Sequence, residues 1–251
     1  MHSQSRLKVQ GNNRANANVR TLRDLIQEKN QALLEHRYFR MCQTGEIGKP
    51  QTLEIVKQLY CFSVFFERLL TRRITEYSSR GNQELLEMAR EHLREEVGHA
   101  ALFRDCLVSN GVSPDDVGKI EPKMFTKAMF GYLVTTIQHE NEYVTNVAIM
   151  QVMESIGFHF FSNTLKVLEA HNLSAEALVH HTEADEHHPE MGWDFVPSFD
   201  ENTMADCQRV VKDVYRLMGF TLDEWLGVAP SAAITGTPRR TRQTNRPARA
   251  S

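Results

Sequence analysis

Long amphipathic segments dominate this chain. The apolar positions of the first segment recur at the three-to-four-residue spacing of one helix face: Val19, Leu22, Leu25, Ile26, Ala32 and Leu33. This spacing predicts a helix over about 17–38. No segment keeps the strict alternation of apolar and polar residues that a half-buried strand requires. The pattern therefore predicts an all-α fold.

Turn and capping signals divide the rest of the chain into further helices. A break at 45–50 precedes a second helix over about 53–78, for which Thr52 is the expected cap. That helix is apolar nearly all round between Leu59 and Phe66, so we expect it at the centre of a bundle. The later helices are expected at about 83–109, 122–137, 140–170 with a bend near Gly157, 174–189, 201–218 and 221–227. The prediction is a single-domain bundle of about seven helices.

The two ends of the chain differ from its middle in composition. Residues 1–16 are polar and are expected to form a flexible lead-in, whereas 17–228 should form the helical domain. Residues 229–251 contain five Arg, no acid and few apolar side chains, so we expect a disordered Arg-rich tail.

Charge and cysteine content narrow the class of function. The net charge is −3, and without the five Arg of the tail the body holds 24 basic and 32 acidic residues, or −8. An acidic body argues against a nucleic-acid partner. The four Cys show no CxxC or zinc-type spacing, which favours a reducing, cytoplasmic setting. No apolar stretch is long enough to span a bilayer, so no membrane partner is expected.

The most informative motif is His181-Thr-Glu-Ala-Asp185-Glu-His187-His188. In a helix, the spacing i, i+4, i+7 places His181, Asp185 and His188 on one face. The alternative is a solvated surface rich in His and acids. His180 and His187 point roughly 100° away from that face.

Three further carboxylates and one imidazole complete the candidate set. Glu67 and Glu154 interrupt strongly apolar helical runs, where a lone carboxylate is costly unless it is paired or bound to a metal. Glu96 and His99 form a Glu-x-x-His pair, which is common alone and gains weight beside the other motifs. The competing candidates are Glu95, His92, Glu140 and Glu142.

Together these residues match the needs of a two-metal site. Carboxylates stabilise and bridge two cations, and neutral imidazoles complete their coordination. Three His and four carboxylates suit two Fe2+ ions, with manganese as the alternative, better than zinc or calcium. The predicted metal ligands are Glu67, Glu96, His99, Glu154, His181, Asp185 and His188.

On these motifs, the chain resembles the haem-oxygenase-like di-iron oxidases and oxygenases, which share the seven-helix fold of TenA and PqqC. The resemblance covers about residues 20–227, and the His181-x3-Asp185-x2-His188 motif is its most specific element. It implies two ferrous ions, dioxygen as co-substrate, and oxidation of a small amine, amino-acid or fatty-acid-like substrate in specialised metabolism. The implied reactions are N-oxygenation, desaturation and oxidative C–C cleavage. The expected partners are the small-molecule substrate, an external electron donor and a second copy of the chain in a homodimer.

Other functions on similar helical folds are open alternatives. A haem oxygenase needs an axial His, for which His36 is the candidate, and a TenA-like thiaminase needs a nucleophilic Cys in its pocket. A cofactorless PqqC-like oxidase would surround an organic substrate with His and Arg. A non-catalytic iron-binding protein would use the same ligands without turnover. For an oxygenase, the candidate aromatic pocket residues are Phe66, Phe103, Phe158, Phe161 and Trp193, and the candidate anchors for a substrate carboxylate are Arg68, Arg94 and Lys166.

Overall fold

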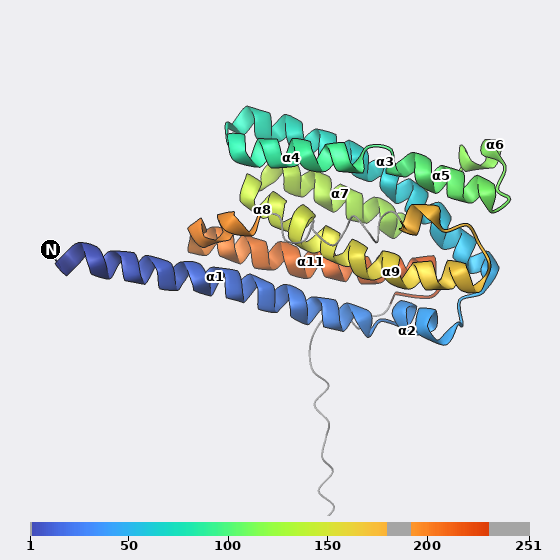
Figure 1. The fold of residues 1–251 in the computed structure, drawn as a ribbon, viewed down its shortest axis with the longest axis horizontal. Coiled ribbons are helices and arrows are strands. Elements are labelled where there is room, and N and C mark those ends of the chain that lie inside the picture. The colour runs from blue at the N-terminus through green and yellow to red at the C-terminus, as the bar shows by residue number, and fades with distance from the viewer. Residues whose placement is uncertain (1, 180–191, 231–251) are drawn as a thin grey trace, which may run out of the picture.

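The computed structural model describes residues 2–179 and 192–230. Within these ranges the regular elements are all helical, and the longer ones lie side by side in an elongated bundle (Figure 1). The elements are α1 (His2–Leu34), α2 (Arg37–Thr44), α3 (Lys49–Arg80), α4 (Gln83–Glu96), α5 (His99–Ser109), α6 (Pro114–Val117), α7 (Met124–His139), α8 (Glu142–Asn146), η1 (Val147–Met153), α9 (Glu154–Ala170), η3 (Trp193–Ser198) and α11 (Glu201–Trp225). The predicted all-α class is confirmed.

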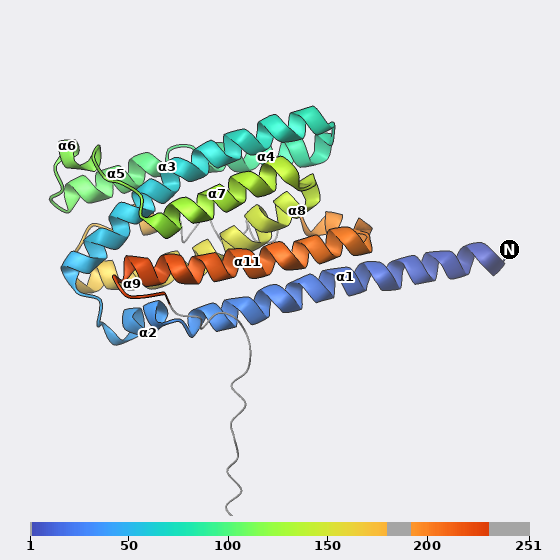
Figure 2. The ribbon, with the colours of Figure 1, turned by 180° about the vertical axis from the view of Figure 1, so that it is seen from behind.

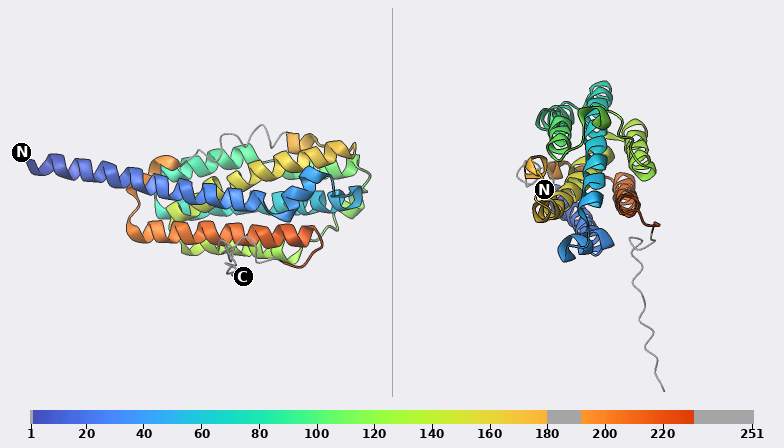
Figure 3. Two further views of the ribbon diagram at one scale, coloured as in Figure 1. Left: turned by 90° about the horizontal axis from the view of Figure 1, so that it is seen from below. Right: turned by 90° about the vertical axis from the view of Figure 1, so that its right-hand side faces the viewer.

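Helix α3 occupies the position expected for its apolar sequence. It packs against α4, α5 and α7, and more lightly against α9 and α11. The end-on view in Figure 3 shows it between α4 and α7. The buried residues of α3 include polar side chains among the apolar ones: Thr52, Gln58, Ser63 and Arg73. This helix can therefore form a wall of an internal site.

Helix α1 covers the opposite side of the bundle, where it packs against α11 and η3 (Figure 2). Its N-terminal end runs past the other helices. The helix begins at His2 and ends at Leu34, so it does not match the expected span of 17–38. A break at His36 separates it from α2, because the His36 side chain accepts a hydrogen bond from the Tyr38 N–H and caps the new helix.

Two other boundaries differ from those expected. Helix α3 begins at Lys49 with Pro in its first turn and Gly48 at the N-cap, so the assignment of Thr52 as the cap is wrong. The Thr52 hydroxyl instead donates to the Gly48 carbonyl at 3.0 Å from inside the helix. Helix α11 runs without interruption from Glu201 to Trp225, where two helices were expected.

The helix expected over 83–109 is broken in the structure. Helix α4 ends at Glu96, and α5 begins at His99. Between them Gly98 has φ +104°, a backbone conformation that L side chains rarely adopt. The Glu-x-x-His pair therefore spans a break between two helices and does not share a helix face.

The segment expected as one helix over 140–170 contains a π-helical stretch. Helix α8 leads into η1, whose seven residues are followed at once by Glu154 at the start of α9. Helix α9 continues through Gly157, near which a bend was expected, and the π-helical stretch lies before Glu154. Each π-helical turn carries an extra residue and so changes which side chains face the core, and such stretches are frequent at functional sites.

No helix in the described ranges combines the length and the apolar character needed to cross a membrane.

Candidate metal centre

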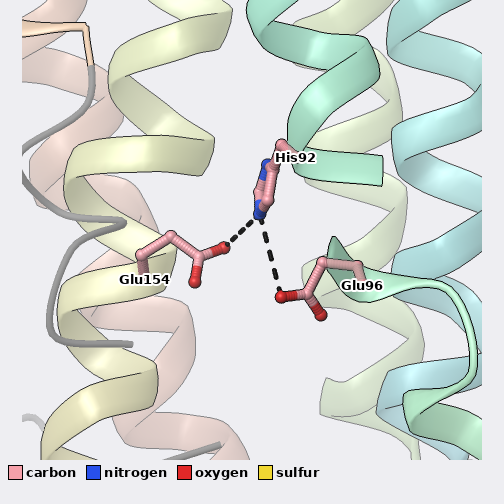
Figure 4. A group of neighbouring side chains, drawn as sticks. All are labelled: His92, Glu96 and Glu154. Atoms are coloured by element: carbon pink, nitrogen blue, oxygen red, sulfur yellow. Dashed lines mark ion pairs between the residues drawn. The ribbon is translucent and has the colours of Figure 1, made fainter. Parts of the chain in front are cut away.

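Three buried side chains meet between α4 and α9. His92 and Glu96 come from α4, and Glu154 opens α9 on the other side (Figure 4). One potential ligand atom from each residue lies within 4.8 Å of those from the other two. The Nε2 atom of His92 lies 3.0 Å from Oε1 of Glu154 and 4.0 Å from Oε1 of Glu96. We refer to His92, Glu96 and Glu154 as the carboxylate cluster.

The carboxylate cluster opens onto an apolar cavity. The cavity holds about 60 Å³, and Glu96 and Glu154 are the only ionisable side chains among its described lining residues. Most of the wall is aromatic or large and apolar: Phe62, Phe66, Phe160, Phe161, Met218 and Trp225. Two carboxylates in such surroundings are costly unless a cation or hydrogen-bond donors compensate them. The donor set therefore fits a metal ion, since carboxylates and imidazole together suit iron or manganese.

His99 is the second imidazole next to the cluster. Its Nδ1 atom lies 2.8 Å from Oε2 of Glu96, and both side chains are buried. An ionised carboxylate only accepts hydrogen bonds, so Nδ1 of His99 is the donor to Glu96. A carboxylate that orients a His in this way is typical of metal-binding imidazoles.

Arg73 reaches the cluster from α3. Its side chain is fully buried, and Nη1 lies 3.2 Å from Nδ1 of His92. The same guanidinium donates to Oδ1 of Asn146 at 2.8 Å and lies over the Tyr77 ring. The sequence analysis gave no role to Arg73 because nothing in the local pattern of α3 marks it as buried.

Glu67 is placed differently from the other predicted carboxylates. Its Oε1 atom accepts the backbone N–H groups of Gly98 at 3.1 Å and Ala100 at 3.3 Å. Glu67 is half-buried, and its carboxylate lies at the first turn of α5. The N-terminus of a helix favours a negative charge at this position. It is therefore adjacent to the Glu96–His99 pair, but it does not belong to the carboxylate cluster.

His181, Asp185 and His188 lie outside the described residues, so their predicted role remains a prediction. The described part of the chain before them ends in helical residues 176–179, as expected for the helix that carries the motif.

The competing carboxylates are engaged elsewhere. Glu95 is exposed, Glu140 pairs with Arg209, and Glu142 lies at the start of α8 beside Arg80. His92 was underrated in the sequence analysis. Its i, i+4 spacing from Glu96 was the available signal, and both side chains are buried on one face of α4.

The residues that would support other chemistries are not at the cavity. His36, the candidate haem ligand, lies 2.8 Å from the buried carboxylate of Asp223 and caps α2. All four cysteines are buried, and burial raises the pKa of Cys42, Cys61 and Cys106 to about 11 and that of Cys207 to about 12. Such thiols stay protonated at neutral pH and are poor nucleophiles.

Of the candidate pocket residues, Phe66 and Phe161 line the cavity, whereas Phe103 packs behind Phe161. Phe158 and Trp193 do not line it. The candidate anchors for a substrate carboxylate are also away from the cavity, because all three are exposed: Arg68, Arg94 and Lys166.

Comparison with known proteins identifies the class to which this fold and site belong. A family model described as iron-containing redox enzyme matches residues 53–220. The match covers more than half of the chain and includes the whole carboxylate cluster. The chain belongs to this family of iron-containing redox enzymes. No curated protein matches it.

Solved structures support the same fold. A domain of unknown function with a haem oxygenase-like fold from Shewanella denitrificans is 14% identical, with a TM-score of 0.68 over 82% of this chain and 90% of that one. A TenA homologue from Pseudomonas syringae is 11% identical, with a TM-score of 0.67 over 83% and 92%. A CADD-like protein of unknown function from Nostoc punctiforme is 14% identical, with a TM-score of 0.63 over 82% and 95%. At these identities the likeness shows the haem-oxygenase-like fold alone.

Proposed function

We propose that this chain is a non-haem di-iron enzyme that uses dioxygen to oxidise a small substrate with an apolar body. The carboxylate cluster carries the proposal, because it places two buried acids at an otherwise apolar cavity, with the imidazole of His92 beside them. The family match supports iron and redox chemistry. The proposed reaction is N-oxygenation, desaturation or oxidative C–C cleavage of an amine, amino acid or fatty acid.

The proposed ligands are those of the sequence motifs: Glu67, Glu96, His99, Glu154, His181, Asp185 and His188. Two ferrous ions, or two manganese ions, held by such a set would supply reducing equivalents and open positions for dioxygen. The geometry of Glu96, His99 and Glu154 supports this role directly, whereas Glu67 would have to give up its contacts with the α5 backbone.

The cavity walls support an apolar substrate body. The rings of Phe62, Phe66 and Phe160 would bind hydrocarbon or aromatic groups by excluding water. Dry walls also protect reactive species at the metal end from water. Neither the described lining nor residues 180–191 contain Lys or Arg, so a substrate carboxylate would have to bind at the metal end.

The first test is metal stoichiometry followed by turnover. The full chain is loaded anaerobically with Fe2+, and iron per chain is measured after removal of excess metal. Dioxygen consumption is then followed with panels of apolar amines, amino acids and fatty acids. We expect up to two irons per chain and substrate-dependent consumption of dioxygen.

The outcome separates the proposal from its alternatives. Iron binding without turnover on any panel would favour a non-catalytic iron-binding protein. Substrate oxidation that survives complete removal of metal would favour a cofactorless PqqC-like oxidase. A chain that binds no divalent metal would overturn the proposal.

A further inference from the structure

We infer that Ser63 is a specificity-determining residue of the cavity, and that its hydroxyl binds a hydroxyl or amino group carried on the apolar body of the substrate. The inference deepens the proposed function and rests on it for the identity of the occupant as a substrate. It also distinguishes among the proposed substrate classes, because an unsubstituted alkyl chain offers a hydroxyl no hydrogen-bond partner.

The position of Ser63 on α3 directs its side chain toward the cavity. A stripe of four α3 residues lines the cavity, and they follow the i, i+3, i+4, i+7 spacing of one helix face: Leu59, Phe62, Ser63 and Phe66. Ser63 is only 9% exposed. It therefore places one buried hydroxyl in a wall that is otherwise apolar along this helix.

The Ser63 hydroxyl has no hydrogen-bond partner within the described part of the chain. Hydroxyls of other helical residues donate to the carbonyl one turn earlier, as Thr71 does at 2.9 Å and Ser162 at 2.6 Å. The Leu59 carbonyl offers Ser63 the same kind of bond, and the hydroxyl does not make it. Buried polar groups in proteins are nearly always hydrogen-bonded, so this hydroxyl is the natural partner for an occupant of the cavity.

The other polar side chains of the described lining have other roles. Nε1 of Trp225 donates to the Thr126 hydroxyl at 2.9 Å. Glu96 and Glu154 belong to the carboxylate cluster and are proposed metal ligands. Ser63 is therefore the uncharged polar group that can orient a substrate relative to the metal end, and a few such groups in an apolar pocket usually set its specificity.

The size of the cavity favours a short group beside Ser63. A dry apolar cavity of about 150 Å³ accepts benzene. This cavity holds about 60 Å³, so it admits a short alkyl group and its polar atom more readily than a long chain. A hydroxyl both donates and accepts, which matches a hydroxyl or an amino group on such a body.

The first test compares two probes that differ in one group, butan-1-ol and 1-fluorobutane. Fluorine on carbon donates no hydrogen bond and accepts one poorly. Saturation-transfer NMR with the full metal-free chain measures the Kd of each probe, so the result does not depend on iron. In Ser63→Ala the preference for butan-1-ol over 1-fluorobutane should fall about tenfold from the wild-type value, a typical effect of one hydrogen bond.

Ser162→Ala is the matched control for the probe experiment. The Ser162 hydroxyl already donates to the Phe158 carbonyl, and Ser162 does not line the cavity. This variant should keep the wild-type preference. An unchanged preference in Ser63→Ala, an equal loss of affinity for both probes, or a wild-type chain that binds neither probe would overturn the inference. A chain that binds no divalent metal would end the proposed function but leave this comparison valid.

The second test separates substrate binding from a structural role of Ser63. A buried hydroxyl without a partner costs stability, so Ser63→Ala should raise the Tm of the metal-free chain in the absence of any probe. Ser162→Ala gains the same helix propensity but loses a hydrogen bond, so its Tm should rise less or fall. A lower Tm for Ser63→Ala than for Ser162→Ala would show that the Ser63 hydroxyl stabilises the fold, and the inference would be wrong.

Discussion

Glu95 and Glu96 are adjacent in sequence and opposite in environment. Glu96 is buried at the cavity, and Glu95 is exposed on α4. Mn2+ at about a hundredfold excess over its Kd should stabilise the wild-type fold by about 2.7 kcal/mol. For a domain of this size that corresponds to a rise in Tm of about 5–10 °C. We expect Glu96→Gln to lose most of this rise in a thermal melt.

The matched control is Glu95→Gln, which removes one carboxylate from the same turn of the helix and should keep the full Mn2+-dependent rise. Equal rises in the two variants would show that Glu96 contributes nothing to metal binding.

Sequence analysis could predict those site residues that stand out against the apolar pattern of their own helix. Glu154 stands out because apolar residues surround it on every side of its helix, and it proves to be buried at the cavity. Arg73 could not be found in this way, because its partners His92 and Asn146 are distant in sequence and only tertiary packing brings them together. The roles of His181, Asp185 and His188 stay predictions.

At the scale of elements, the break between α4 and α5 depends on Gly98. Its φ of +104° disfavours any side chain, although a Cβ would meet no atom within 4 Å. Gly98→Ala should therefore lower the free energy of unfolding by about 1–2 kcal/mol through backbone strain alone. Urea denaturation of the metal-free chain measures the change.

Gly131→Ala provides the control for Gly98→Ala. Gly131 lies exposed within α7, a Cβ added there would meet no atom within 4 Å, and its φ is not positive. Alanine should raise the free energy of unfolding there by about 0.5–1 kcal/mol. If the two substitutions changed stability in the same direction, the strain argument for Gly98 would be wrong.

Glu67 should stabilise the same break before any metal binds. Glu67→Ala removes the acceptor of two backbone N–H groups at the start of α5 and should cost about 1–2 kcal/mol in the metal-free chain. Glu67→Gln keeps an accepting oxygen and should cost less. The comparison uses the same urea denaturation, and unchanged stability in Glu67→Ala would leave Glu67 with no structural role in this turn.

The break between α4 and α5 and the π-helical stretch could not be predicted from the apolar pattern. The apolar stripe continues from α4 into α5, so periodicity alone favoured one helix over 83–109. The break is held by a contact from outside this stretch, since the Gly98 N–H donates to Glu67 on α3, 31 residues away in sequence. The π-helical stretch before Glu154 was missed for a similar reason, because residues 147–153 have an ordinary helical apolar sequence.

At the scale of the whole molecule, the all-α bundle could be predicted because its helices bury most of their apolar residues in one large core. Most buried apolar residues of α1, α3, α7, α9 and α11 belong to one large cluster, and a smaller cluster joins Tyr77 of α3 to Leu85, Leu86 and Ala89 of α4. Amphipathic periodicity can predict a fold that is stabilised by such a core. It does not predict whether two copies of the chain associate. The homodimer therefore remains a prediction, which sedimentation of the full chain would test.

The stability of the whole fold should depend on two imidazoles outside the cavity. Desolvation lowers the pKa of His36, partly opposed by the carboxylate of Asp223, and desolvation alone lowers that of His159. Near pH 6.5 the unfolded chain then binds more protons than the folded chain. The population of the unfolded chain therefore grows as the pH falls. The free energy of unfolding should be fully present above about pH 6.5 and should decline as the pH drops through the lower folded pKa values.

His159→Gln isolates one part of this dependence. Glutamine cannot be protonated in either state, so the variant should lose less stability than the wild type between about pH 7.5 and 5.5, on either side of the ordinary His pKa. Urea denaturation of the metal-free chain at a series of pH values measures both slopes. Because carboxylates contribute equally to the two proteins, the difference between the slopes reports His159 alone. Parallel slopes would mean that His159 binds protons as readily in the folded chain as in the unfolded one, which its burial beside α1 argues against.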